Sequence, residues 1–325
     1  MKQGILIMGY GTRKGNLVEV LESQAARLRA MTDYEVAVGY FRVSSPTLVE
    51  ALESLVDKGV ERVALVPYYV AEGKLTHFMM PEKIGMPGYA EYAQLEVKGK
   101  KIEAYKAQAF DFDPVVTDIV CDRIAGMGGT KDSGIMVLGH GTLDESLMNR
   151  AVIQRNAERL SARGYRHVAF AFNEFCGPSI HDAMAKLVGE GAKEIVCIPL
   201  FIAMGLHLGD EIPEQLGIPA YSEGGEVEFE GKKITIKYTR PLEDDPRLAE
   251  LVLRKATEYL ERCPCAFSSW MPPTAGRCCP AGTSAPVTRS PSPTCTRSPP
   301  PSSGRRWSPS ASGSSSAPPR ATSTS

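Results

Sequence analysis

The sequences LGHGT at residues 138–142, FNEFCGPS at 172–179 and GLHLGDEIP at 205–213 decide which fold this chain is expected to adopt. Each follows an apolar run of β-branched and aliphatic residues, namely GIMV, HVAFAF and EIVCIPLFI. Such runs are typical of buried parallel strands, so each sequence is placed where a strand ends and a loop begins. Open α/β sheets bind their ligands at that edge. Residues 134–213 are therefore predicted to contain a ligand site.

Four polar side chains fall at these strand ends: His140, Glu174, His207 and Glu211. Two imidazoles and two carboxylates that converge can bind a divalent metal or act as acids and bases. Taken singly, each histidine would more often be a hydrogen-bonded structural residue. Glu211 could instead favour the N-terminus of a following helix, and Asp210 offers a second carboxylate beside it. Taken together, the four side chains favour a functional site.

These sequences resemble the signature of the sirohydrochlorin cobaltochelatases, in the two-repeat long form of the class II chelatase superfamily. In that family one strand ends in GHG(S/T), a second in a Glu four residues before Pro-Ser, and a third leads into GxHxxx(D/E)(I/L)P. The matching residues here are His140, Glu174 and His207 with Glu211. The resemblance covers residues 3–262. It implies that His140, Glu174 and His207 bind the metal, and that these three and Glu211 are catalytic.

The resemblance also implies a reaction, the insertion of a divalent metal, Co²⁺ first, into sirohydrochlorin during cobalamin and tetrapyrrole biosynthesis. Such an enzyme is a lyase, its metal is a substrate, and two pyrrole protons are released. Glu211 would accept a proton or orient the His207 imidazole. A nickel or iron chelatase stays open, because all three metals accept His and carboxylate ligands. A non-catalytic carrier of the metal or the tetrapyrrole stays open as well.

The body of the chain is a tandem duplication. GILIMGYGT at 4–12 matches GIMVLGHGT at 134–142 at an offset of 130, and GVERVALVP at 59–67 matches GAKEIVCIP at 191–199 at an offset of 132. Strands alternate with helices in each copy, which predicts parallel βαβ units. The expected strands lie near 4–9, 34–41, 61–68 and 101–107, and the expected helices near 16–30, 46–58 and 113–126. Ser45-Pro46 and Asp113-Pro114 are interpreted as helix N-termini, and the segment between the last two strands as a long loop.

The fold class is therefore α/β, with two tandem chelatase-like lobes, each a doubly wound, mostly parallel sheet. The lobes are expected at residues 1–131 and 132–262, and the resemblance implies a pseudo-twofold between them. His140, Glu174, His207 and Glu211 correspond to Tyr10, Arg42, Leu75 and Met79 in the first copy. Since the surrounding glycines and prolines are shared while these four side chains are not, the second lobe is expected to bind the metal and the first to be a degenerate wall.

The first lobe offers residues for the substrate instead. Tyr10, Arg42 and Lys74 are predicted at its strand ends, and sirohydrochlorin, which carries eight carboxylates, needs cationic partners there. A solvated rim is the alternative for each charge. His77 lies two positions from the slot of His207, and whether it joins the site is left open.

The composition indicates a globular protein, because 43% of the 325 residues are hydrophobic and 23% are charged. No apolar run is long enough to span a membrane, and no signal-peptide pattern is found. The net charge of −1 argues against nucleic acid as a partner. We expect a cytoplasmic monomer or homodimer with reduced cysteines. No nucleotide is expected, because there is no Walker sequence and Lys14 and Asp144 stand where a dinucleotide fingerprint has its third glycine.

The composition changes at residues 263–325, where Ser, Pro, Thr, Ala and Arg dominate and Leu, Ile and acidic residues are missing. Such a segment cannot bury enough apolar surface to fold, so we expect a low-complexity tail, disordered or produced by a frameshift. It contains Cys263, Cys265, Cys278 and Cys279. We expect no iron–sulfur cluster, because an unfolded scaffold does not hold thiolates in cluster geometry.

Overall fold

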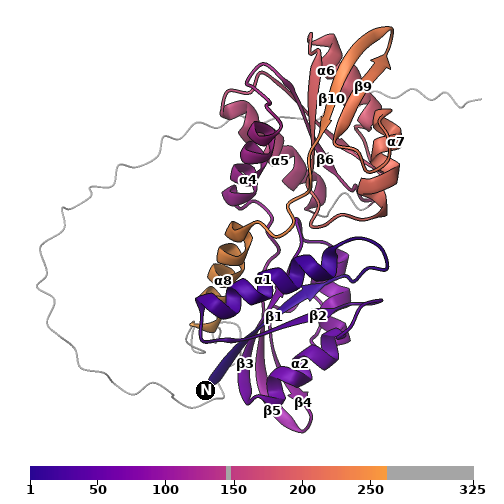
Figure 1. The fold of residues 1–325 in the computed structure, drawn as a ribbon. Helices are drawn as coiled ribbons and strands as arrows, with labels where there is room; N and C mark the ends of the chain where they lie inside the picture. Colours follow the sequence, from indigo (N-terminus) through magenta and orange to yellow (C-terminus); the bar gives the residue numbers. More distant parts are fainter. Residues whose placement is uncertain (144–147, 262–325) are drawn as a thin grey trace, which may run out of the picture. The chain divides into compact units, whose positions relative to one another are not determined.

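The computed structural model describes residues 1–143 and 148–261. The first half of this part forms a five-stranded sheet with helices on both faces (Figure 1). Its strands are β1 (Lys2–Gly9), β2 (Glu35–Tyr40), β3 (Val60–Pro67), β4 (Tyr92–Val97) and β5 (Lys100–Lys106). Its helices are α1 (Leu17–Met31), α2 (Leu48–Asp57), the π-helical turn η1 (Leu75–Met79), α3 (Met80–Lys83) and α4 (Pro114–Gly126). The strand order is β2-β1-β3-β5-β4.

The second half repeats this arrangement, so the predicted duplication is confirmed. Its strands are β6 (Gly134–Gly139), β7 (His167–Phe172), β8 (Glu194–Pro199), β9 (Gly224–Phe229) and β10 (Lys232–Tyr238). Its helices are α5 (Asn149–Ala162), α6 (Ile180–Gly189), the π-helical turn η2 (His207–Glu211), α7 (Ile212–Leu216) and α8 (Pro246–Leu260). The strand order, β7-β6-β8-β10-β9, is that of the first sheet. The fold class is thus two mostly parallel α/β sheets, as the sequence predicted.

The predicted long loop before residue 101 is wrong, because the segment contains η1, α3 and the edge strand β4. β4 pairs antiparallel with β5 through a tight turn in which Lys98 and Gly99 have φ values of 52° and 75°. Two consecutive left-handed residues match the right-handed twist of a hairpin, and Lys-Gly is a weaker hairpin signal than Asn-Gly. The same pattern recurs with β9 and β10.

The start of α2 also differs from its prediction at Ser45-Pro46. The helix begins at Leu48, and Thr47 is its N-cap: the Thr47 hydroxyl accepts a hydrogen bond from the Glu50 amide, while the Glu50 carboxylate accepts one from the Thr47 amide. Pro46 lies before the helix, and its carbonyl accepts a hydrogen bond from the amide of Tyr40 at 2.9 Å. The Asp113-Pro114 prediction is confirmed, since Asp113 caps α4 through the amide of Val115.

Both faces of the central strands are buried, as expected for parallel sheets. In β1, Ile5 and Ile7 pack into the core that contains α1, whereas Leu6 and Met8 pack into the core that contains α2. In β6, residue 135 and residue 137 likewise face α4 and α5, and residues 136 and 138 face α6 and α7. This double burial explains why the strands appear as continuous apolar runs in the sequence.

The last helix of each half packs on the other half. α4 packs against α5 and β8, while α8 packs against α1 and β3 (Figure 1). Side chains of the β3 region continue this exchange, because Arg62 Nη1 donates to the Leu260 carbonyl at 2.9 Å. The boundary near residue 131 therefore separates the two sequence repeats, but the packing of α4 and α8 crosses it.

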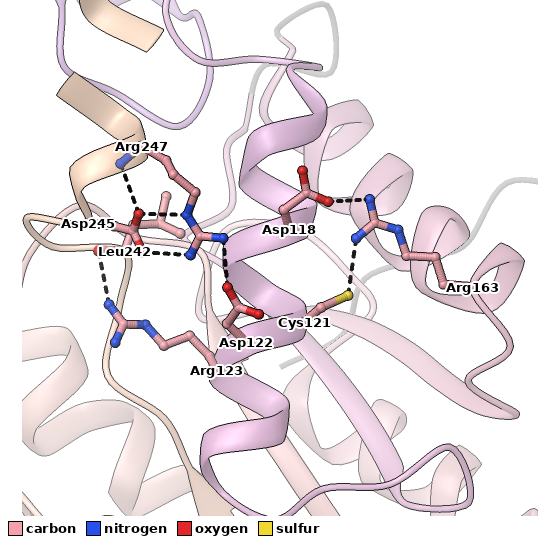
Figure 2. A network of polar contacts seen from close by, with 8 residues as sticks. All are labelled: Asp118, Cys121, Asp122, Arg123, Arg163, Leu242, Asp245 and Arg247. Carbon is pink, nitrogen blue, oxygen red and sulfur yellow. Dashed lines mark hydrogen bonds and ion pairs between the residues drawn. The ribbon is translucent and has the colours of Figure 1, made fainter. Parts of the chain in front are cut away.

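A polar network around α4 links it to both helices that it touches (Figure 2). Arg163, at the C-terminus of α5, pairs with Asp118 at 2.5 Å and donates to the Cys121 sulfur at 3.2 Å. On the other side, Arg247 of α8 pairs with Asp122 at 2.6 Å. Arg123 donates to the Leu242 carbonyl at 3.2 Å. Polar contacts thus attach α4 to α5 on one side and to α8 on the other.

Three further expectations concern membrane helices, the C-terminal tail and the cysteines. No helix in the described ranges is both long and apolar enough to cross a membrane. The tail predicted at residues 263–325, with Cys263, Cys265, Cys278 and Cys279, lies outside the described residues. Within the described part, the free cysteines are Cys121, Cys176 and Cys197.

The buried hydroxyl of Tyr68 provides a test of the helix exchange. It donates to the Glu243 carbonyl at 3.0 Å and accepts from Gln24 Nε2 at 2.9 Å. Tyr68→Phe removes the side-chain donor to the Glu243 carbonyl and one of the two acceptors of Gln24 Nε2, which keeps the Asp245 carbonyl, so we expect the free energy of unfolding to fall by about 1–3 kcal/mol. Tyr40→Phe is the matched control, because the buried Tyr40 hydroxyl has no hydrogen-bond partner among the described residues. Urea denaturation measures both, and equal losses would contradict the assignment.

Candidate metal centre

The site is built on the ends of β6 and β7, which are adjacent parallel strands. The amide of Asn173 donates to the Gly139 carbonyl at 2.9 Å, and the amide of Glu174 to the His140 carbonyl at 3.1 Å. Gly141 allows this approach, because it has φ 96° and a Cβ there would lie 1.8 Å from the Glu174 carbonyl oxygen. The glycine after His140 therefore brings the two predicted ligands together on neighbouring strands.

His140, Glu174 and His207 converge in the structure. One ligand atom from each lies within 4.8 Å of the other two. His140 Nε2 is 3.2 Å from a Glu174 oxygen, and the two imidazole rings are perpendicular with centroids 5.0 Å apart. The three side chains are 35–40% exposed, which leaves an open face for an incoming ligand. Two imidazole nitrogens and one carboxylate form a donor set that Co²⁺, Ni²⁺, Fe²⁺ and Zn²⁺ all accept.

Glu211 acts on this group through His207. Its carboxylate lies 2.5 Å from His207 Nδ1, four residues earlier in the same π-helical turn. The His207 hydrogen bond holds the pKa of Glu211 below its usual value, although partial burial opposes this. Glu211 makes no hydrogen bond as an N-cap of α7, so the helix-terminus interpretation finds no contact. With Nδ1 occupied, Nε2 is the His207 nitrogen available to a metal.

The other partners of the ligands orient them in a similar way. A proton on His140 Nδ1 can be accepted by the Gly141 carbonyl at 3.2 Å, which leaves Nε2 for a metal. Asn173 Nδ2 lies 3.5 Å from Glu211, and Gln215 Nε2 donates to the side-chain oxygen Oδ1 of Asn173 at 2.9 Å. Sequence reasoning missed Asn173 and Gln215. Their only signal was their closeness in sequence to Glu174 and Glu211.

Aromatic side chains border the same site and were also missed. The rings of Phe175 and Phe201 lie 5.8 Å and 6.1 Å from the His140 ring. Phe175 is 53% exposed and has φ 66°, a conformation rarely adopted by bulky residues. Its counterpart Val43 has φ 71° and is exposed as well. Backbone strain of this kind is common at ligand sites.

Glu211→Gln should weaken Co²⁺ binding about 10- to 100-fold at neutral pH. The amide keeps the size of the side chain but loses the charge that makes His207 a better ligand and fixes its tautomer. Isothermal titration with Co²⁺ measures the change. Glu214→Gln, an exposed acidic residue in α7, is the matched control and should leave the affinity unchanged. Equal affinities of the Glu211→Gln variant and the unaltered chain would remove Glu211 from this role.

The first half keeps the backbone of the site and replaces its ligands. Gly11 also has φ 96°, and its Cβ would lie 1.8 Å from the Arg42 carbonyl oxygen. The amide of Arg42 donates to the Tyr10 carbonyl at 3.0 Å, as Glu174 does to His140. The Arg42 guanidinium lies 5.1 Å from the Tyr10 ring centroid and 5.0 Å from that of Phe41. Leu75 and Met79, the counterparts of His207 and Glu211, begin and end η1.

The two remaining candidates of the first half lie in or beside η1. Lys74 is exposed at the residue before this turn. His77 lies 3.5 Å from the buried carboxylate of Glu72 and stacks on Tyr89, with ring centroids 5.9 Å apart. Within the described residues, the three-residue ligand group contains His140, Glu174 and His207 and does not contain His77.

The fold and this site together define a two-repeat chelatase-like protein. The CbiX family profile matches residues 4–127 and again residues 134–259. The chain therefore belongs to the CbiX family.

Among its relatives are two proteins named sirohydrochlorin cobaltochelatase. The one from Methanococcoides burtonii is 30% identical over 128 residues, which are 39% of this chain and 96% of that protein. The one from Methanosarcina acetivorans is 31% identical over 134 residues, which are 40% of this chain and 99% of that protein. Each of these relatives thus matches a length close to one repeat.

Solved structures share the fold of the whole body. The sirohydrochlorin chelatase SirB from Bacillus subtilis subspecies spizizenii, in complex with cobalt, has a TM-score of 0.62 at 15% identity and covers 82% of this chain and 98% of that one. SirB from Bacillus subtilis with Fe³⁺ has a TM-score of 0.61 at 17% identity, with 80% and 98% covered. At these identities the likeness establishes the fold alone.

Proposed function

We propose that this protein is a lyase that inserts a divalent metal into sirohydrochlorin, with Co²⁺ as the expected metal. The convergence of His140, Glu174 and His207 carries the proposal. Membership of the CbiX family and the names of the cobaltochelatase relatives support it. The metal is a substrate here, so a half-exposed site with three protein ligands suits it better than a closed structural site with four.

In the proposed reaction, His140, Glu174 and His207 hold the metal while the macrocycle approaches from the exposed side. Neutral imidazoles bind divalent ions without adding charge, so the ion can pass to the pyrrole nitrogens. Two pyrrole protons must leave as the metal enters. Glu211, ionised and hydrogen-bonded to His207, accepts one of them and passes it to solvent, and the second leaves directly to water at the exposed face of the site.

Tyr10, Arg42 and Lys74 are proposed to bind the substrate. The Arg42 guanidinium occupies the slot of Glu174 and makes no ion pair with any residue that the structure describes. It is therefore free to bind a substrate carboxylate. Arg42→Gln should raise KM about tenfold and change kcat less, because the contact exists in the ground state and in the transition state alike. A loss of kcat at unchanged KM would count against this role.

An anaerobic absorbance assay tests the proposed function. Sirohydrochlorin is mixed with Co²⁺, Ni²⁺ or Fe²⁺ in turn, and the metallated product is followed with and without the protein. Acceleration with Co²⁺ above the other two supports a cobaltochelatase. Preference for nickel or iron would keep the chelatase and change its metal. Binding without acceleration would indicate a carrier.

We also propose that the protein is cytoplasmic and acts as a monomer or a homodimer.

A further inference from the structure

A pocket of about 500 Å³ lies in the first half, next to Arg42. It is lined by Phe41, Lys74, Phe78, Met79, Glu82 and Lys83. Its volume falls in the range of small-molecule sites, and its wall combines apolar rings with charges at the rim. Neither of its lysines makes an ion pair with another described residue, whereas Lys83 Nζ lies 5.7 Å from the Phe41 ring centroid.

The lining of this pocket corresponds to residues that adjoin the candidate metal centre in the other repeat, although Tyr10, Arg42 and Leu75, the counterparts of its three ligands, are not part of the lining. At the offset of 132, Phe41 corresponds to Asn173, Met79 to Glu211 and Lys83 to Gln215. In the second half these positions form a polar chain, from Gln215 through Asn173 to the carboxylate beside His207. In the first half the same positions provide a ring, a thioether and an ammonium group. Across the whole lining two lysines outnumber one carboxylate, that of Glu82, around apolar side chains, and this combination suits an apolar, negatively charged ligand.

The wall that contains Lys74, Phe78 and Met79 is fixed from beneath by a buried carboxylate. Glu72 is 3% exposed and accepts hydrogen bonds from Lys106 Nζ at 3.2 Å, from the Ala109 amide at 2.8 Å and from the Thr76 hydroxyl. Thr76 lies within η1, between Lys74 and Phe78.

The second half has no such buried ion pair at the matching positions. Met204 and Tyr238 replace Glu72 and Lys106, and the Tyr238 hydroxyl donates to the Leu208 carbonyl at 3.2 Å. A buried ion pair costs desolvation, so it is better explained by the geometry that it specifies than by stability. It holds η1 in place and thereby fixes the pocket wall before a ligand arrives.

We propose that this pocket binds one carboxylated edge of the tetrapyrrole. A pyrrole ring packs between Phe41 and Phe78, and its acetate and propionate groups pair with Lys74 and Lys83. Offset packing of aromatic rings and charge-assisted hydrogen bonds are the interactions that such a ligand can make there. The inference rests on the proposed function for the identity of the ligand and adds the residues that select a carboxylated ring.

The test measures binding without metal insertion. Metal-free uroporphyrin, which carries eight carboxylates, is titrated into the full chain and its fluorescence is followed. The Lys74→Gln/Lys83→Gln double variant should raise Kd about tenfold or more, whereas Lys74→Arg/Lys83→Arg should stay within about threefold of the unaltered chain. Lys101→Gln is the control, because Lys101 is exposed at the N-terminal end of β5, whereas Phe41 and Lys74 of the pocket follow the C-terminal ends of β2 and β3.

The outcomes separate this inference from the proposed function. A Kd for the Gln double variant within about twofold of the unaltered chain would overturn the inference. So would an equal loss in Lys101→Gln, or no binding of uroporphyrin by the unaltered chain. If uroporphyrin binding depends on the two lysines but the chain inserts none of Co²⁺, Ni²⁺ and Fe²⁺ into sirohydrochlorin, the pocket assignment stands and the proposed chelatase function falls. In each case Co²⁺ titration should give the same affinity in the double variant, because the metal centre is untouched.

Discussion

His207→Ala is expected to weaken Co²⁺ binding at least about 100-fold and to abolish metal insertion. The change removes one of three converging ligands and also the short hydrogen bond between that imidazole and Glu211. Loss of a group that merely orients a ligand costs about 10- to 100-fold, so loss of the ligand itself costs more. Isothermal titration with Co²⁺ and the anaerobic insertion assay measure the two effects. His140→Ala should behave in the same way.

Two control variants accompany this prediction. Leu75→Ala changes the counterpart of His207 in the first half, and His181→Ala removes an exposed histidine of α6. Both should keep Co²⁺ affinity and turnover within about twofold of the unaltered chain. Near-normal turnover of His207→Ala would place the metal elsewhere, and His77 would be the next residue to change.

Gly141→Ala should lower the free energy of unfolding by about 3 kcal/mol or more and disable the metal centre. The new Cβ would lie 1.8 Å from the Glu174 carbonyl oxygen, so the ends of β6 and β7 must separate. The left-handed backbone at φ 96° adds about 1–2 kcal/mol for any residue with a Cβ. Because that separation moves His140 away from Glu174, Co²⁺ affinity should fall together with stability.

Gly191→Ala isolates the backbone contribution. Gly191 also has φ 96°, but a Cβ there meets nothing within 4 Å. It should therefore cost only the left-handed part, about 1–2 kcal/mol, and leave Co²⁺ affinity unchanged. Urea denaturation followed by circular dichroism compares the two variants. Equal destabilisation by both would mean that the loop after His140 moves aside freely, and the packing argument for Gly141 would fail.

The sequence predicted the sheets and the places of the candidate ligands because both depend on local patterns. Continuous apolar runs mark strands buried on both faces, and β1 and β6 are buried in this way. The glycine after His140 is shared by both copies, as Gly11 and Gly141, and in both it allows a close approach of the neighbouring backbone. Duplication supplied the comparison of Tyr10 with His140, which predicted that the second half offers the candidate metal ligands, and the three side chains converge there.

Features that depend on distant contacts were not predicted. η1 and α3 are short, and β4 has a mixed pattern of burial, so none of the three gives a strong periodic signal in the sequence. The Asn173–Gln215 contact joins residues 42 positions apart, and no motif connects them. The packing of α4 and α8 was missed because two copies of a helix have the same pattern whichever sheet they cover. Helical periodicity shows that a helix has an apolar face and does not show which partner receives it.

The exchange of terminal helices limits how far the two repeats can diverge. α4 belongs by descent to the repeat without metal ligands, yet it packs on β8, the strand that leads to the loop of His207. Substitutions in residues 114–126 therefore affect β8 and the loop that carries His207, although the first repeat contributes none of the three candidate ligands. The first repeat, which has Tyr10, Arg42 and Leu75 in place of the candidate ligands, is therefore not a structurally independent copy. A helix that it encodes supports the candidate site of the other half through β8.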